Sequence, residues 1–406
     1  MALCSMVVDF NSYFASVEQQ LQPKLRGLPV AVVPVMAEST CCIAASYEAK
    51  KFGVRTGTRV SDARHMCPGL KVVEARPSLY VECHHDLIKA VDSCVHVEEI
   101  WSIDEMACEL TGKWQQREKA CELALKIKKK IATTVGEELR CSIGIAPNPF
   151  LAKTASDMQK PDGLVVIEQQ DLPQCLYHLE LRDFGGIGRN MEKRLHQHGI
   201  RTVEAFCAAS KDDLRRVWGG VGGERMYQAL RGEFVYRAPT NKSSVGHSHV
   251  MPPEERNEAS AFSVLSRLLQ KAAMRLRKMR YCAGGMQLFV KHTRDSQWNE
   301  ECTFLETQDT IELLRVLRML WKRRSPGSPP PLAVGVTLCR LVEEENLTAS
   351  LFEKDSSRRD LNARIDKINN SFGKNTIYFA GAHDARESAP MRIAFNYVPD
   401  VETDGD

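Results

Sequence analysis

The sequence lacks long hydrophobic runs, and this absence excludes a membrane span. No apolar stretch in its 406 residues approaches the roughly 20 residues of a transmembrane helix. Asp9 interrupts the apolar N-terminal segment and no small-residue cleavage site follows, which argues against a secretory signal peptide. We therefore expect a cytoplasmic protein, associated with the nucleoid if the organism is bacterial.

Paired cysteines and a strong net charge are also missing. None of the 14 cysteines forms a C-x-x-C pair, so neither a zinc ribbon nor a thioredoxin-like site is supported. A disulfide framework does not suit a chain of this length, and we expect free thiols in a reducing compartment. The net charge of +3 predicts no partner by itself. Basic residues are nevertheless concentrated between Arg267 and Arg280.

Composition and patterning predict an α+β protein of several domains. Hydrophobic residues make up 43% and charged residues 26%, which is typical of a globular chain. A chain of 406 residues exceeds what one core usually serves, so we expect about two to four domains. The pattern predicts strands at 5–8, 30–33, 41–45, 72–73, 100–110, 141–145 and 164–167, and helices at 12–21, 80–97 and 117–135.

The second half of the chain changes character. Residues 168–238 read as short helices with Gly-rich turns, and the polar segment 239–246 reads as a linker. Strands are expected at 244–251, 285–291 and 332–341, with helices at 259–279 and 310–323, in a β-α-β-β-α-β-like domain. A last helix is expected to carry an apolar face and to end before the C-cap glycine Gly373. That face consists of Leu361, Ile365, Ile368 and Phe372.

Two places concentrate carboxylates in apolar surroundings. Asp9 ends a predicted strand, and Asp104 and Glu105 are adjacent acids in a hydrophobic run. Neighbouring strand residues point to opposite faces, so Asp104 and Glu105 share a site only at a tight turn or bulge. Three converging carboxylates need a cation, and oxygen ligands without histidine or cysteine favour Mg²⁺ or Mn²⁺. The alternative is a helix cap at Asp9 and an ordinary turn at 104–105.

The helix expected after Asp9 could bind a triphosphate. Its first turn near Ser12 would present free N–H groups and the positive end of the helix dipole. Tyr13 and Phe14 are bulky residues at that entrance, where a ring packed against a bound sugar would reject a 2′-hydroxyl group. The alternative is that both are ordinary core aromatics.

Five motifs in order resemble those of Y-family, translesion DNA polymerases, and most of all the bacterial DNA polymerase IV branch. The motifs are VDFNSYFASVE, YEAKKFGVRTG, SIDE, SIGIAPNPFLAKTASDMQKPDG and FGGIGRNMEKRLHQHGI, and the resemblance spans about residues 3–345. It implies a right-hand polymerase with an additional little-finger domain. The implied parts are a palm at 1–12 and 78–167, fingers at 13–77, a thumb at 168–238, a linker at 239–246, a little finger at 247–345 and a C-terminal extension at 346–406.

The resemblance also implies roles for individual residues. Asp9, Asp104 and Glu105 match the catalytic carboxylates that bind two Mg²⁺ ions (or Mn²⁺), and the Phe10 carbonyl would help to hold one of them. Phe14 matches the steric gate against ribonucleotides. Lys153 and Asp157 lie on the same motif as Lys160. The residues matching those that contact the incoming deoxynucleoside triphosphate are Tyr13, Phe14, Tyr47, Lys50 and Lys160.

Three departures from the family pattern stand out. Asn11 replaces a further aspartate of many relatives, at a position that is not a usual ligand. Lys50 replaces an arginine, which keeps the charge but loses the bidentate geometry. The segment between Leu347 and Phe352 is similar to the motif that docks bacterial polymerases on the sliding clamp, but the leading glutamine is absent. A segment that folds back on its own little finger is the alternative.

Two regions are expected to hold primer-template DNA. Gly186 and Gly188, followed by Lys193, resemble a helix–hairpin–helix in which backbone N–H groups approach a phosphate. A plain interhelical turn is the alternative. Arg275 and Lys278 lie off the apolar stripe of the 259–279 helix and could grip a duplex together with Arg280, Lys291 and Arg294. A solvated helix face is the alternative there.

The function expected is low-fidelity, template-directed translesion DNA synthesis by a monomer. The first alternative is a catalytically silent member of the family that bridges clamp and DNA. The second is another two-metal enzyme, such as a repair nuclease using the same acids.

Overall fold

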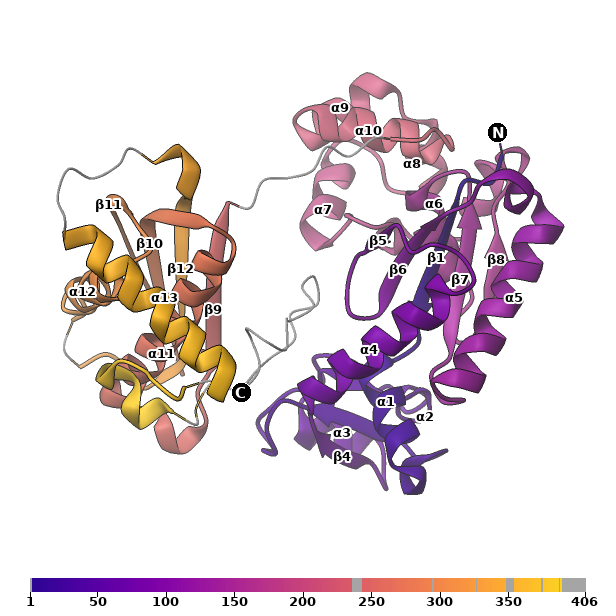
Figure 1. Cartoon of the computed structure of the whole chain (residues 1–406). Coiled ribbons are helices and arrows are strands. Elements are labelled where there is room, and N and C mark those ends of the chain that lie inside the picture. The colour runs from indigo at the N-terminus through magenta and orange to yellow at the C-terminus, as the bar shows by residue number, and fades with distance from the viewer. Residues whose placement is uncertain are drawn as a thin grey trace. The chain divides into compact units, whose positions relative to one another are not determined.

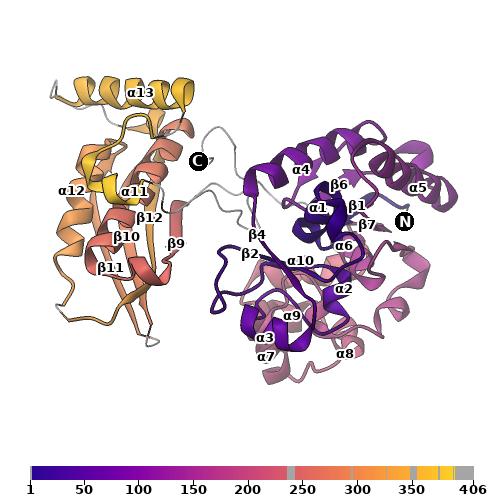
Figure 2. The same cartoon turned by 90° about the horizontal axis from the view of Figure 1, so that it is seen from below.

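The computed structural model describes residues 2–235, 243–293, 296–325, 327–347, 354–373, 375–386 and 388. The chain forms two compact units (Figures 1 and 2). The described part of the first covers residues 2–235, and that of the second begins at residue 243. No helix in the described residues has both the length and the apolar character that crossing a membrane requires.

A five-stranded sheet, in the order β5-β6-β1-β7-β8, forms the centre of the first unit. β1 lies in the middle, antiparallel to β6 and β7, and all six of its residues are buried. The predicted single strand at 100–110 is wrong, because a turn at residues 101–104 separates β5 from β6. The strands are β1 (Ser5–Phe10), β5 (Glu99–Ile100), β6 (Glu105–Glu109), β7 (Cys141–Ala146) and β8 (Leu164–Val166).

Three helices pack on this sheet. α4 (Pro77–Asp92) and α5 (Arg117–Thr134) lie side by side (Figure 1), and α6 (Pro149–Met158) packs against β7 and β1. α6 approaches β7 at Gly144 so closely that a Cβ there would lie 2.0 Å from the Ala152 carbonyl oxygen. A glycine is therefore required for α6 to lie where it does.

Residues 13–74 build a second, small three-stranded sheet with short helices, where the predicted strands 30–33, 41–45 and 72–73 fall. The order is β3-β2-β4, with β2 parallel to β4 and antiparallel to β3. α1 packs on β2 and β3. The elements are α1 (Tyr13–Leu21), β2 (Val30–Val33), β3 (Ala44–Ala45), α2 (Tyr47–Lys50), α3 (Val60–Met66) and β4 (Lys71–Glu74).

The described residues from 168 to 235 are helical and contain no strand, as the Gly-rich pattern predicts. Their core residues Phe184 and Phe206 belong to the same buried cluster as Val7 of β1 and Ala152 of α6. The longer helices are α7 (Arg189–Gln197), α8 (Val203–Ala208), α9 (Lys211–Trp218) and α10 (Val221–Leu230).

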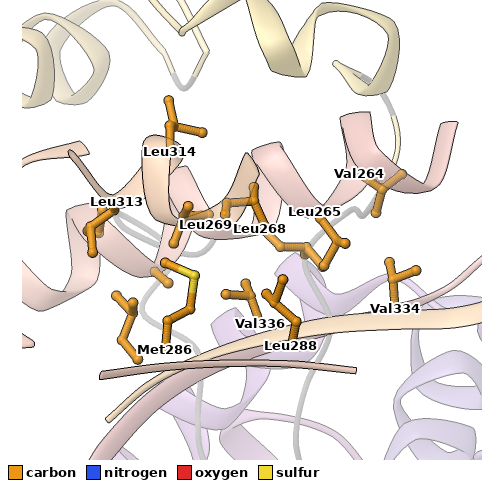
Figure 3. Packing of buried hydrophobic residues seen from close by; sticks show 14 of the residues in the cluster. Val264, Leu265, Leu268, Leu269, Met286, Leu288, Leu313, Leu314, Val334 and Val336 are labelled. Atoms are coloured by element: carbon orange, nitrogen blue, oxygen red, sulfur yellow. The ribbon is translucent and has the colours of Figure 1, made fainter. Parts of the chain in front are cut away.

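The second unit is an antiparallel four-stranded sheet, in the order β11-β10-β12-β9, covered on one face by helices. Leucines and valines of α11 and α12 interdigitate with Met286, Leu288, Val334 and Val336 of the sheet (Figure 3). The elements are β9 (Ser244–Val250), α11 (Glu258–Lys278), β10 (Tyr281–His292), β11 (Gln297–Thr307), α12 (Thr310–Trp321) and β12 (Pro331–Glu343).

Two expectations for this unit need correction. β9 begins at Ser244, so the last three residues of the predicted linker 239–246 are strand, and 239–242 lie outside the described residues. β11 received no strand assignment from the sequence, although its accessibility alternates between exposed and half-buried residues. Its polar residues, three glutamates among them, weaken the apolar signal that identifies a half-buried strand.

The C-terminal segment packs on α11 through an ion pair and through apolar residues, Phe379 and Ala385, that join the core of this unit. Nε and Nη2 of Arg277 donate to the carboxylate of Asp366 in α13 (Lys354–Phe372), at 2.6 and 2.8 Å. Gly373 has a φ of 100°, as predicted for a C-cap glycine. Only part of the predicted apolar face is covered, because Ile365 and Ile368 are half-buried while Leu361 is 43% and Phe372 is 78% exposed. Residues 348–352 of the candidate clamp motif lie outside the described residues.

Candidate active site

Strand register brings the predicted carboxylates together at one end of β1. Asp9 of β1 lies directly opposite Glu105 of β6, and the backbone N–H of Phe10 donates to the carbonyl of Asp104 at 2.8 Å. Asp104 is the last residue of the turn and Glu105 the first residue of β6. The tight turn that would allow both adjacent acids to serve one site is therefore present.

The turn itself is fixed by two short hydrogen bonds. The Ser102 hydroxyl donates to the Asp104 carboxylate at 2.6 Å, and Nδ1 of the buried His84 donates to the Ile103 carbonyl at 2.8 Å. Burial lowers the pKa of His84 to about 4, so this imidazole is neutral at physiological pH. The position of Asp104 thus depends on α4 as well as on the sheet.

The site favours a bound cation electrostatically. Burial, and then the charge of Asp9, raise the pKa of Asp104 above its usual range. Burial likewise raises the pKa of Glu105, although Lys153 opposes that effect. Carboxylates in such surroundings remain ionised only beside positive charge.

Lys153 supplies that charge here. Its ammonium lies 2.5 Å from Asp9 Oδ2, 2.7 Å from Glu105 Oε1 and 3.1 Å from Asp157 Oδ2. Burial alone would lower its pKa, but the three carboxylates raise it. Lys160 binds the other Asp9 oxygen at 2.7 Å and also Asp157 at 2.8 Å. The close packing of α6 at Gly144 brings Lys153 to this position.

The donor set fits a hard divalent cation. Asp9 and Glu105 converge on one ammonium group, which stands where a cation would be held, and their donors are oxygens, as Mg²⁺ and Mn²⁺ prefer. Within the described part of the chain, no group of three His, Cys, Asp or Glu side chains is already arranged to hold a metal ion. A metal ion bound by Asp9 and Glu105 would therefore have to displace the Lys153 ammonium from these two carboxylates.

Two predicted nucleotide-binding residues face this cluster from α2. The Lys50 ammonium lies 4.3 Å from the centroid of the Tyr47 ring. Burial, and then the charge of Lys160, lower the pKa of Lys50, and Asp9 opposes them. Burial raises the pKa of Tyr47, with Lys160 acting in the opposite direction. Tyr47, Lys50 and Lys160 thus surround the approach to Asp9.

The two aromatic residues at the start of α1 are both buried. Tyr13 is 3% and Phe14 is 6% exposed, and their ring centroids lie 5.8 Å apart. The Tyr13 hydroxyl donates to the backbone carbonyl of Tyr80 at 2.6 Å. Both residues therefore belong to the core of the molecule, and their contact with a sugar stays a prediction.

Asn11 has a structural role that explains the departure from aspartate. Its side-chain amide donates to the Ser142 hydroxyl at 3.1 Å, and its oxygen accepts from the Asp162 N–H at 2.7 Å. These bonds join β1 to β7 and to the loop after Lys160. Toward the three acids Asn11 offers only its amide N–H, which donates to the backbone carbonyl of Asp9 at 3.5 Å, in keeping with its exclusion from the ligand set.

The predicted DNA-binding glycines lie in an exposed turn at the start of α7. Gly186 has a φ of 87°, a conformation that favours glycine, and Gly188 is the N-cap of the helix. Lys193 is exposed on the same helix. Another Gly-rich turn, at 218–223, has a packing role, since a Cβ at Gly223 would lie 2.1 Å from the Leu214 carbonyl oxygen.

The basic surface predicted on the second unit is not continuous. α11, which carries Arg275 and Lys278, covers one face of the sheet. Lys291 alternates with the core residue Val290 along β10 and is exposed on the opposite face. Arg275 and Lys278 therefore stay predicted DNA contacts without Lys291, and Arg294 lies outside the described residues.

Sequence analysis missed two residues that organise the site. Lys153 received no role, although the i,i+4 spacing of Lys153 and Asp157 on a helix signals an ion pair. His84 gave no signal at all, because its partner is a backbone carbonyl almost twenty residues away.

The neutrality of His84 predicts a pH dependence of stability. Its pKa is about 4 in the fold and about 6.5 when unfolded, so the unfolded state binds more protons between these values. The free energy of unfolding should therefore fall by about 3 kcal/mol as the pH drops from 7 to 4. Urea unfolding of His84→Gln should show a shallower fall over that window, and an equal slope would contradict this account.

Comparison with known proteins identifies the family. Residues 8–157 match the impB/mucB/samB family, 242–351 match the C-terminal domain of that family, and 182–233 match the DNA polymerase-iota thumb domain. A DNA polymerase IV of Pelotomaculum thermopropionicum is 31% identical over 92% of this chain and 93% of its own length. A DNA polymerase IV of Bacillus anthracis is 30% identical over 90% of both chains.

Solved structures agree with this fold. A Y-family DNA polymerase chimera of Dbh and Dpo4 matches 84% of this chain and 100% of its own, with a TM-score of 0.70 and 24% identity. An insertion ternary complex of Dbh DNA polymerase matches with a TM-score of 0.56 over the same shares. The palm, fingers, thumb and little-finger architecture predicted above is consistent with these neighbours. The chain therefore belongs to the Y-family of DNA polymerases, a family of DNA-directed DNA polymerases that includes the bacterial DNA polymerase IV enzymes.

Proposed function

We propose that this protein performs low-fidelity, template-directed DNA synthesis past damaged bases. The primer 3′-hydroxyl attacks the α-phosphorus of a deoxynucleoside triphosphate and forms a new P–O bond. The bond from the α-phosphorus to the bridging oxygen breaks, and pyrophosphate leaves with that oxygen. The observation that carries the proposal is the convergence of Asp9 and Glu105 on one cationic group beside Asp104, at the start of α1.

Divalent ions would be held by the three carboxylates. Asp9, Asp104 and Glu105, with the Phe10 carbonyl, are the proposed ligands of two Mg²⁺ ions, or of Mn²⁺. When bound, such ions neutralise the charge that develops on the phosphates. Lys153 would give up Asp9 and Glu105 while keeping Asp157, its third partner.

The nucleotide would be oriented by positive groups from both sides. Lys160, Lys50 and the first turn of α1 would meet the triphosphate, and the Tyr47 hydroxyl would donate to it. Tyr13 and Phe14 would lie beside the sugar, with Phe14 as the gate that rejects a 2′-hydroxyl. No histidine contacts the three acids in the described residues, so water-assisted removal of the primer proton is proposed.

Primer-template DNA would be held without sequence readout. The exposed turn at Gly186 and Gly188, with Lys193, would bind phosphates, and Arg275 and Lys278 would add positive charge. We propose a cytoplasmic monomer that docks on the sliding clamp through the segment between Leu347 and Phe352. The short fingers segment would constrain the nascent base pair little, consistent with low fidelity.

Primer extension with Mg²⁺ tests the proposal and its two alternatives. Extension opposite undamaged and damaged templates, only when nucleotides are present, supports a translesion polymerase. DNA binding without extension would favour a silent accessory protein, and shortening of DNA without nucleotides would favour a nuclease. Adding the sliding clamp tests the docking segment. If the segment binds the clamp, the extension products should be longer than without it.

The lysine at position 50 predicts weaker nucleotide binding than an arginine would give. Lys50→Arg should lower the KM for the deoxynucleotide by about fivefold, because a guanidinium can form two parallel bonds to phosphate oxygens. Steady-state insertion of one nucleotide measures this. Lys51→Arg, at the exposed neighbouring lysine, is the control and should change nothing. An unchanged KM in Lys50→Arg would show that a lysine in place of the arginine at position 50 does not affect the affinity for the nucleotide.

A further inference from the structure

The proposed gate Phe14 is supported from behind by a second aromatic ring. The Tyr80 ring stacks on Phe14 with centroids 4.7 Å apart and an interplanar angle of 19°. Tyr80 lies on α4 and is fully buried. A ring that excludes a hydroxyl group by contact fails if it retreats by a fraction of an ångström, so whatever holds Tyr80 limits the movement of Phe14.

Tyr80 is held at both ends. Its backbone carbonyl accepts a hydrogen bond from the Tyr13 hydroxyl at 2.6 Å, and its own hydroxyl donates to Glu18 Oε1 at 2.7 Å. Glu18 lies on α1 four residues after Phe14, and hence on the same side of the helix. The residue that holds Tyr80 behind the Phe14 ring, Glu18, therefore lies on α1, the same helix that carries Phe14.

Glu18 is a fully buried carboxylate with a single cationic partner. Arg76 binds it in a bidentate manner, with Nε 3.1 Å from Oε1 and Nη2 2.5 Å from Oε2. The Gln22 amide donates to Oε2 at 2.7 Å. A buried carboxylate loses much of its stability as an anion when its cation is removed, so Arg76 determines whether Glu18 can hold the Tyr80 hydroxyl.

We propose that the Arg76–Glu18 ion pair, acting through Tyr80, sets the sugar selectivity of the enzyme by fixing Phe14 in place. This inference rests on the proposed polymerase function and adds positioning residues to it. Arg76 and Glu18 touch neither the reacting atoms nor the sugar. Their effect should therefore appear in the discrimination between ribonucleotides and deoxynucleotides rather than in the chemical step.

The test uses the full-length variants Arg76→Met, Tyr80→Phe and the double variant. Single-nucleotide insertion gives kcat/KM for a deoxynucleotide and for the matching ribonucleotide. Each single variant should raise ribonucleotide kcat/KM about tenfold, while deoxynucleotide kcat/KM stays within about threefold. If Arg76 acts through Tyr80, the double variant should match the stronger single one instead of multiplying both effects. Arg76→Lys, which keeps the cation, should restore part of the discrimination.

Arg117→Met is the matched control, since it removes a partly exposed ion pair, Arg117 to Glu168 at 2.8 Å, that lies outside this network. Its sugar selectivity should equal that of the wild type. A purely structural role for Arg76 would lower both kcat/KM values together or leave their ratio unchanged, and either result overturns the inference. If Arg76→Met does not fold, Tyr80→Phe and Arg76→Lys decide in the same way.

The proposed function fails separately. A wild-type protein that does not extend primers refutes the polymerase proposal. A Phe14→Ala variant with unchanged selectivity refutes the gate. Should Phe14→Ala admit ribonucleotides while Arg76→Met and Tyr80→Phe behave as wild type, only the inference about the ion pair is lost.

Discussion

Replacing Asp104 with asparagine should lower the rate of primer extension about a thousandfold. Asp104 is a half-buried carboxylate beside Asp9, and its side chain accepts a hydrogen bond from its neighbour Ser102. Asparagine keeps the size of the side chain and an oxygen for that bond but loses the charge that a divalent ion requires. The fold should therefore survive while metal binding weakens. Single-turnover extension measures the rate, and thermal unfolding checks the fold.

Asp157→Asn provides a stringent control for this experiment. Asp157 binds the two lysines that also bind Asp9, Lys153 at 3.1 Å and Lys160 at 2.8 Å, yet it is not a proposed metal ligand. Its loss should lower the rate by at most about tenfold, because it removes one partner of two lysines and none of the three proposed metal ligands. If Asp104→Asn and Asp157→Asn behave alike, or if Asp104→Asn extends primers as the wild type does, Asp104 is not a metal ligand.

The sequence predicted the fold class and most elements because their signals are local. β1 is apolar throughout, and the long helices carry stripes of period 3.6, so neither needs information from distant residues. β11 was missed because its residues are mostly polar. The turn at 101–104 was hidden within a hydrophobic run, although the chemistry of Asp104 and Glu105 required some such turn.

The site was predictable where charge in an apolar strand revealed it, and unpredictable where tertiary packing creates it. Asp9, Asp104 and Glu105 were found because unpaired acids in a core are costly. Lys153 was not, because its contact with Asp9 depends on the approach of α6 to Gly144. The ion pair between α13 and α11 was missed for a similar reason, since Arg277 and Asp366 lie 89 residues apart in the chain and meet only in the fold.

Phe14→Ala is expected to have the largest effect on substrate choice. The Phe14 ring is 6% exposed and backed by Tyr80, so it cannot yield to an added hydroxyl group. Truncation to alanine removes the ring and should raise the ratio of ribonucleotide to deoxynucleotide kcat/KM by about a hundredfold, the order of discrimination that a close-fitting pocket provides. Single-nucleotide insertion with both sugars measures the ratio.

The deletion of a buried ring also destabilises a protein, and selectivity must be separated from that loss. Phe262→Ala removes a partly buried ring that packs on Trp321 in the second unit, for which no nucleotide contact is proposed. It should lower thermal stability without changing the ratio of the two sugars. Equal ratios in Phe14→Ala and the wild type would show that Phe14 is only a core residue. A gain confined to ribonucleotides would identify it as the gate, because loss of stability cannot improve the use of one substrate alone.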